Sequence, residues 1–275
     1  MKKKWTVMTW LVGAIILSVS FTGEVQAQDT ALSIEHLPRV VGAAVAMIPD
    51  YEGSDDYTVG AAPFARYNFQ GQERYLMLKG YELQCNLLDH PWLRLGPSLN
   101  YRFGRDDDVD DDVIEEMEEI DGTGEGGGFL GVELVDSANP RKRFLASVDF
   151  LTDLGGEHDG SSVYVSARFW YPLSKTFDFG MGVSTTYASD GYMSTYFGVT
   201  QVDADRTGLR VYEADGGFKD IRVFPALVMH LSETWHLALG VQYRGLLGDA
   251  EDSPVVDDRG SSSQWLSGVG VAYSW

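Results

Sequence analysis

The chain has 275 residues, with 41 Asp and Glu against 21 Lys and Arg, a formal net charge of −20 and one cysteine. So acidic a chain repels nucleic acid, because phosphate binding depends on Lys and Arg, and its charge does not draw it to an anionic membrane surface. The lone Cys85 cannot form an intrachain disulfide. No motif surrounds it, so we interpret it as a small apolar strand residue rather than a nucleophile.

The N-terminus has the form of a secretory signal peptide over residues 1–27. Lys2, Lys3 and Lys4 precede an apolar run at 10–21, and Val25-Gln26-Ala27 resembles a small-x-small cleavage site. The apolar run is shorter than the roughly 20 residues of a membrane-spanning helix, so we expect cleavage rather than anchoring. Residues 28–275 contain no comparable run, which excludes a helical membrane protein, and we expect them to form one domain.

Apolar and polar residues alternate in repeated segments of this domain, separated by turn residues. The pattern predicts twelve strands near residues 39–48, 58–69, 74–86, 92–103, 127–136, 143–153, 162–171, 176–188, 193–201, 220–231, 235–246 and 264–275. Several have about 10 to 12 residues, which matches the roughly 9–11 of a tilted membrane strand and exceeds the usual 5–6 of a globular strand. We count twelve because an even number is typical of bacterial barrels.

The alternation by itself fits either a soluble sandwich or a membrane barrel. Aromatic residues near strand ends favour the barrel, because they can form two interfacial girdles; these are Trp92, Tyr101, Phe103, Trp170, Tyr171, Trp235, Tyr243, Trp265 and Trp275. The final stretch, Trp265 to Trp275, shows the pattern most clearly, with apolar and aromatic residues on one parity and mostly small residues on the other. The predicted fold is an all-β, antiparallel transmembrane β-barrel of the Gram-negative outer membrane.

The connections predict how the barrel is oriented. Short turns at 172–175 and 232–234 are expected in the periplasm, and the long polar stretches 104–126, 202–218 and 248–263 are expected outside the cell. Segment 193–201 has no clean parity in this scheme. Either it belongs to a long loop at 189–218, or one N-terminal strand is miscounted.

The acidic run at 106–121 is the most conspicuous local feature. It lacks EF-hand form, because Asp111 and Met117 stand where that loop needs Gly and Glu. We predict a solvated, mobile loop, the alternative being loose divalent-cation binding that bridges to lipopolysaccharide. The glycine-rich stretch 122–128 lacks the Lys-Ser/Thr pair and the helix of a phosphate cradle, and we predict a flexible loop end.

No other pattern indicates chemistry. The five histidines His36, His90, His158, His230 and His236 show no metal-ligand spacing. Only His230 and His236 flank one turn, and two histidines make an incomplete zinc site. There is no G-x-S-x-G motif, and Ser147 with Asp149 lacks a placed histidine. We predict no catalytic, cofactor-binding or metal site, no cofactor and no enzymatic activity.

Four elements together resemble the MltA-interacting protein (MipA/OmpV) family of outer-membrane proteins. They are 49–57 (PDYEGSDDY), 86–106 with its Tyr101-Arg102-Phe103-Gly104-Arg105-Asp106, 192–220 with its Lys219-Asp220, and 246–256 (LLGDAEDSPVV). The resemblance runs in order over nearly the whole mature chain. The family usually ends on Phe, where this chain has Trp275, and the resemblance implies that the assembly machinery recognises this terminal aromatic.

The resemblance implies a non-enzymatic scaffold in the outer membrane, in contact with lipid and lipopolysaccharide. Its expected partners are a lytic transglycosylase and a peptidoglycan synthase, with turns 172–176 and 231–235 as contact points by position. The alternative hypothesis is a small porin-like channel or binding protein for cationic solutes, because the acidic charge concentrates cations. The family supplies no catalytic residues to carry over, and it does not account for the acidic run.

Overall fold

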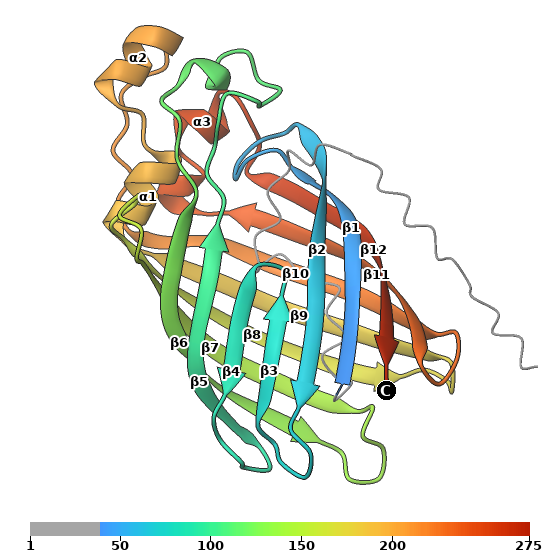
Figure 1. The fold of residues 1–275 in the computed structure, drawn as a ribbon. Coiled ribbons are helices and arrows are strands. Elements are labelled where there is room, and N and C mark those ends of the chain that lie inside the picture. Colours follow the sequence, from blue (N-terminus) through green and yellow to red (C-terminus); the bar gives the residue numbers. More distant parts are fainter. Residues whose placement is uncertain (1–38) are drawn as a thin grey trace, which may run out of the picture.

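A computed structural model describes residues 39–275, so the predicted signal peptide at 1–27 and His36 lie outside the described residues. Twelve antiparallel strands form one closed barrel in which each strand pairs with its sequence neighbour and β1 pairs with β12 (Figure 1). The strands are β1 (Arg39–Pro49), β2 (Tyr57–Asn68), β3 (Tyr75–Lys79), β4 (Glu82–Asn86), β5 (Leu93–Arg102), β6 (Thr123–Val135), β7 (Arg143–Asp153), β8 (Ser161–Pro172), β9 (Phe177–Ala188), β10 (Gly217–His230), β11 (Trp235–Leu246) and β12 (Ser263–Ser274).

The predicted number of strands is confirmed, but two predicted strands are wrong in compensating ways. Segment 74–86 forms two short strands, β3 and β4, because Gly80 adopts a positive φ of 58° and turns the chain back. Segment 193–201 is not a strand: most of it lies in helix α1 (Asp190–Phe197), whose buried face carries Tyr192, Met193, Tyr196 and Phe197. The prediction thus missed one hairpin and counted one helix as a strand.

Alternation along the strands separates an apolar outer wall from a polar interior, as predicted. On β12, Trp265, Val269, Val271 and Tyr273 are exposed, whereas Gln264, Leu266, Ala272 and Ser274 are buried. The ten residue-to-residue steps from Trp265 to Trp275 span about 33 Å along the strand at about 3.3 Å each, or about 25 Å of height at a 40° tilt. That height matches the apolar band of an outer-membrane barrel.

Most of the predicted girdle aromatics lie on the outer wall near its two edges. Trp92, Tyr171, Trp235 and Trp275 are exposed near one edge and Tyr101 and Trp265 near the other. Trp170 is an error in that prediction: it is 6 % exposed and faces the interior, where its ring lies over Gly180. Gly182 similarly leaves room for the ring of Phe224, so glycines on β9 accommodate aromatic rings inside the barrel.

The two ends of the barrel differ in their connections. The start of β1 and the end of β12 lie together at one end, where Val40 pairs with Ser274. The five connections β2–β3, β4–β5, β6–β7, β8–β9 and β10–β11, none longer than seven residues, also lie there (Figure 1); we call this the short-turn end. At the opposite, long-loop end lie helix α1, helix α2 (Gln201–Thr207) and helix α3 (Pro254–Asp257), with the 3₁₀ turns η2 (Ile114–Glu116) and η3 (Gly248–Ala250). The predicted short turns and long loops thus lie at opposite ends of the barrel.

The long loops pack together into a cap with its own apolar core. One cluster joins Tyr192, Met193 and Phe197 of α1 to Val256 of α3, and a second joins Tyr51 to residues of the acidic run and of α3. The acidic loop keeps most of its carboxylates exposed, but it is not the fully solvated loop that was predicted, because Ile114, Met117 and Ile120 are buried in this cap. The glycine-rich stretch is not a loop end either, since residues 123–128 lie in β6.

Candidate functional site

A buried carboxylate lies at the centre of the most highly connected polar cluster beneath the cap. Glu52 projects from the β1–β2 loop into the barrel and is 8 % exposed. It forms an ion pair with Lys219 of β10, accepts a hydrogen bond from Arg244 Nη1 of β11 at 3.2 Å and accepts another from the Tyr192 hydroxyl of α1 at 3.1 Å. Glu52 therefore ties a loop and a helix of the cap to the barrel wall.

The electrostatics of this cluster favour the ionised form of Glu52. Burial alone would raise its pKa, but the charges of Lys219, Arg244 and Arg222 outweigh burial and hold the pKa of Glu52 below its ordinary value. Asp220 supplies the second carboxylate, 2.7 Å from Arg222 and 3.1 Å from Lys219. Three cations and two carboxylates thus meet on one side of the barrel interior.

The same cluster continues to the opposite wall. Arg102 of β5 donates from Nη1 to the Tyr192 hydroxyl at 2.8 Å and pairs with Glu125 of β6 at 2.9 Å. The connected path from Lys219 through Glu52, Tyr192 and Arg102 therefore runs from β10 to β5, nearly half way round the twelve-strand barrel. We call this path the lumen bridge. It crosses the opening beneath the cap at the long-loop end.

The sequence prediction named no site residues, and the lumen bridge is what it missed. A signal was present, because Glu52, Arg102, Tyr192 and Lys219 all lie within the sequence elements on which the family resemblance rests. These elements are far apart in the chain, and only the closed barrel brings them together. Charged residues inside strands whose other face is apolar were the usable clue, since a barrel interior must pair them.

A second charge cluster lies nearer the short-turn end. The Glu133 carboxylate of β6 accepts from three guanidinium groups: Arg94 at 3.0 Å, Arg143 at 2.8 Å and Arg66 at 3.3 Å. The Arg66 guanidinium also lies over the ring of Tyr75, 4.2 Å from its centroid. This cluster crosslinks β2, β5, β6 and β7 and leaves an excess of positive charge in this part of the interior.

Two histidines at the short-turn end form a continuous hydrogen-bonded chain. His230 and His236 face each other with their Nδ1 atoms 2.7 Å apart. His230 Nε2 lies 2.8 Å from Asp178, and His236 Nε2 lies 2.8 Å from the Ser274 hydroxyl. One arrangement satisfies every contact with both rings neutral: Ser274 donates to His236, His236 donates to His230, and His230 donates to Asp178. The other two described histidines are also partnered, His90 by backbone amides of its own turn and His158 by Glu125 and two tyrosine rings.

The two turns that the sequence predicted as contact points are built alike. In 173–177 (LSKTF) the Ser174 hydroxyl accepts from the amides two and three residues further on, at 3.1 Å each. In 231–235 (LSETW) the Ser232 hydroxyl does the same at 3.2 and 3.0 Å. Each turn exposes its leucine, Leu173 by 60 % and Leu231 by 58 %. We call these the twin turns; they follow one another along the rim of the short-turn end.

The acidic charge of the chain is concentrated at the long-loop end. Among the described loops there, the basic residues are Arg105, Arg206, Arg210 and Arg259, and acidic residues outnumber them several-fold. Most of the acidic run is exposed, but Asp111 is buried and pairs with Arg259 at 2.7 Å. Burial would raise the pKa of Asp111, but hydrogen bonds from Arg259 and from the amides of η2 outweigh it and lower the pKa.

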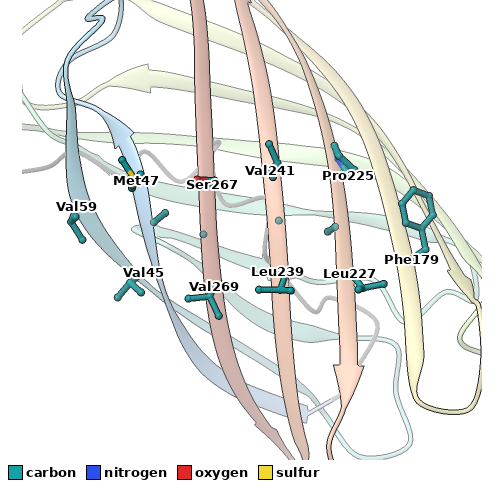
Figure 2. Close-up of a pocket in the computed structure, with 14 residues that line it drawn as sticks. Val45, Met47, Val59, Phe179, Pro225, Leu227, Leu239, Val241, Ser267 and Val269 are labelled. Atoms are coloured by element: carbon teal, nitrogen blue, oxygen red, sulfur yellow. The ribbon is translucent and has the colours of Figure 1, made fainter.

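The outer wall carries a shallow apolar depression of about 840 Å³. Figure 2 shows Val45, Ser267, Val241 and Pro225 among the side chains that line it, from neighbouring strands β1, β12, β11 and β10. These residues have outward parity, so the depression belongs to the wall that faces the membrane rather than to the lumen.

Residues 39–275 contain no group of three or more His, Cys, Asp or Glu side chains arranged to hold a metal ion, and no helix among them is long and apolar enough to cross a membrane.

A closed antiparallel barrel with an apolar band, aromatic edges, a charged interior and long loops at one end is an outer-membrane β-barrel. The short-turn end of such a barrel faces the periplasm. The sequence also matches the family described as "MltA-interacting protein MipA" over residues 41–275. The chain therefore belongs to the MipA family, as the sequence elements predicted.

The solved structure of one porin supports the fold. The NanC porin has a TM-score of 0.51 at 10 % identity, covering 86 % of this chain and 100 % of that chain. The KdgM porin gives a TM-score of 0.43 at 10 % identity over 86 % and 99 % of the two chains, and OmpT of Vibrio cholerae gives 0.38 at 8 % identity over 86 % and 96 %. No curated protein matches the chain in sequence.

Proposed function

We propose that this barrel is a non-enzymatic scaffold in the outer membrane, whose periplasmic face recruits peptidoglycan-remodelling enzymes. The partner classes are a lytic transglycosylase and a peptidoglycan synthase. The observation that carries the proposal is the difference between the two ends: a cap and the lumen bridge occupy the long-loop end, whereas the twin turns present two exposed leucines to the periplasm. Membership of the MipA family supports the same proposal, because the family description names an MltA interaction.

The twin turns suit a docking role for a physical reason. Each is fixed by two hydrogen bonds from backbone amides to one serine hydroxyl, so little conformational entropy is lost when a partner binds. Each offers an exposed apolar side chain beside a charged one, Lys175 in one turn and Glu233 in the other. Two rigid apolar contacts flanked by opposite charges give a partner both affinity and a preferred orientation.

The test is a pull-down from envelope extracts with purified barrel as bait, followed by mass spectrometry of the recovered proteins. We expect wild type to recover a murein hydrolase or synthase, and the double variant Leu173→Ser with Leu231→Ser to lose most of it. Leu154→Ser is the matched control, because Leu154 is 66 % exposed at the opposite end. Recovery of neither enzyme class above background by wild type would overturn the proposal.

A porin-like channel for cationic solutes is the second candidate, favoured by the acidic long-loop end, whose field concentrates cations. The lumen bridge argues against it, since it crosses the interior with side chains that are mostly buried. Planar-bilayer recording separates the two functions. A scaffold gives no cation-selective current, and a steady cation-selective conductance from pure protein would favour the channel. If the barrel is a channel, its exposed acidic residues contact lipopolysaccharide only through bridging divalent cations.

A further inference from the structure

Two buried carboxylates meet on the interior wall beside the short β3–β4 hairpin, apart from the lumen bridge. Glu82 of β4 and Asp149 of β7 are 3 % and 5 % exposed. Both accept a hydrogen bond from the same atom, Gln84 Nε2, at 2.6 Å each. Their two oxygens are therefore close enough for one metal ion to bridge, since Ca²⁺ binds oxygens at about 2.3–2.6 Å and can span about 5 Å between opposite ligands.

These carboxylates have less counter-charge than the other buried acids on the strands. Among residues 39–275, the ion pair of Glu82 is with Lys79, at 3.5 Å, and Asp149 accepts a hydrogen bond from the neutral Ser147 hydroxyl at 2.7 Å. Glu133, by contrast, is surrounded by three guanidinium groups. Two neighbouring buried carboxylates, of which one pairs with an ammonium group, favour the uptake of a further positive charge.

A second, independent observation points to a ligand at the same place. Ser98 Oγ and Asn100 Oδ1 of β5 are buried and have no hydrogen-bond partner, and the two residues are 1 % and 8 % exposed. The strand register places Asn100 opposite Glu82 and Ser98 opposite Gln84. The Asn100 amide nitrogen donates to Glu125 at 2.6 Å, which leaves its oxygen to face another partner. Buried polar atoms without partners are costly, so the site is incomplete as it stands.

We propose that Glu82, Gln84, Ser98, Asn100 and Asp149 bind one divalent cation, with Ca²⁺ as the preferred ion. The cation takes the position between the two carboxylates where Gln84 Nε2 now lies, and rotation of the Gln84 amide presents its oxygen as a ligand instead. Carboxylate, amide and hydroxyl oxygens are hard ligands, and Ca²⁺ accepts the irregular geometry that such a set provides. Mg²⁺ requires near-octahedral geometry and is expected to bind more weakly.

The experiment is calorimetric titration of Ca²⁺ into chelator-treated, refolded barrel in detergent. We expect one site with a Kd on the order of 0.1–1 mM, the range of extracellular calcium modules. The double variant Glu82→Gln with Asp149→Asn should weaken it at least tenfold. The variant D106N/D107N/D108N controls for loose binding at the exposed acidic run and should keep the site. Ser98→Ala should weaken it, whereas Ser162→Ala, which removes another buried hydroxyl without a partner, should not.

Folding is checked separately, because the carboxylate variants remove a repulsion. The double variant should unfold at the same temperature as calcium-free wild type or higher, and Ca²⁺ should raise the midpoint of wild type alone. Absence of a saturable site in wild type would overturn the proposal. So would a site that the double variant retains, or stabilisation of wild type by mild acid without any response to Ca²⁺, which would mean that a proton holds the pair.

Discussion

Removing the charge of Glu52 should destabilise the barrel far more than removing an exposed charge from the same cap. In Glu52→Gln, Lys219, Arg222 and Arg244 lose the Glu52 carboxylate, and of the two carboxylates of this cluster Asp220 remains beside Lys219 and Arg222. Loss of one member of a buried ion pair typically costs 3–5 kcal/mol, because the remaining charges stay desolvated. The glutamine still fills the space and can accept from Tyr192, so we expect the lower end, about 3 kcal/mol. Urea unfolding in detergent, followed by tryptophan fluorescence, measures this loss in the free energy of unfolding.

The contribution of Glu52 to stability should depend on pH. The folded-state pKa of Glu52 lies below the ordinary value of 4.5, so its contribution to stability is fully present above that value and is lost as the pH falls through the folded pKa. The difference between wild type and Glu52→Gln should therefore be constant near neutral pH and shrink below about pH 4.5. Glu119→Gln, at an exposed position of the acidic run, is the control. If Glu52→Gln costs no more than Glu119→Gln, the ion cluster does not stabilise the fold as argued.

Three further substitutions test the packing around this cluster. Gly182→Ala should cost about 1–3 kcal/mol, because its new Cβ would lie 2.0 Å from the ring of Phe224; unchanged unfolding in urea would mean that the ring is free to move. Ile114→Ala should cost about 2 kcal/mol or more and speed proteolysis within the acidic run, and a cleavage rate equal to wild type would contradict the cap. Asp111→Asn should remove the pair with Arg259 and cost about 1 kcal/mol, because the guanidinium is partly exposed; urea unfolding checks it.

The barrel was predictable from the sequence because its outer wall obeys a local rule. A strand that faces lipid on one side and a polar interior on the other must alternate, and the predicted limits of β7 and β11 match the structure to the residue. The rule fails where the local pattern is shared by another structure. Residues 74–86 read as one strand because Gly80 and Tyr81 interrupt the alternation so briefly, and only the positive φ of Gly80 reveals the hairpin.

The acidic run shows a different kind of failure. Its composition indicated a self-repelling loop, and its eleven Asp and Glu residues dominate any average over the segment. The outcome is decided by three apolar side chains, Ile114, Met117 and Ile120, which pack against Tyr51 and α1. Their partners come from loops more than fifty residues away in sequence. A composition argument cannot weigh such contacts, because burial of a few apolar groups offsets the repulsion of charges that remain in water.

The sequence could not predict the lumen bridge, for a related reason. Glu52 and Lys219 are 167 residues apart, and Arg102 and Tyr192 are 90 apart. Periodicity predicts that Arg102 points inward, but Lys219 is buried beside the inward Asp220 because the strand register shifts between Phe218 and Asp220. Any inward acid could neutralise either cation. The choice depends on which loop folds into which part of the interior, and that is set by the cap. Pairing inside a barrel is thus a property of the closed sheet and its loops together, and the family elements were informative because they contain both halves of each pair.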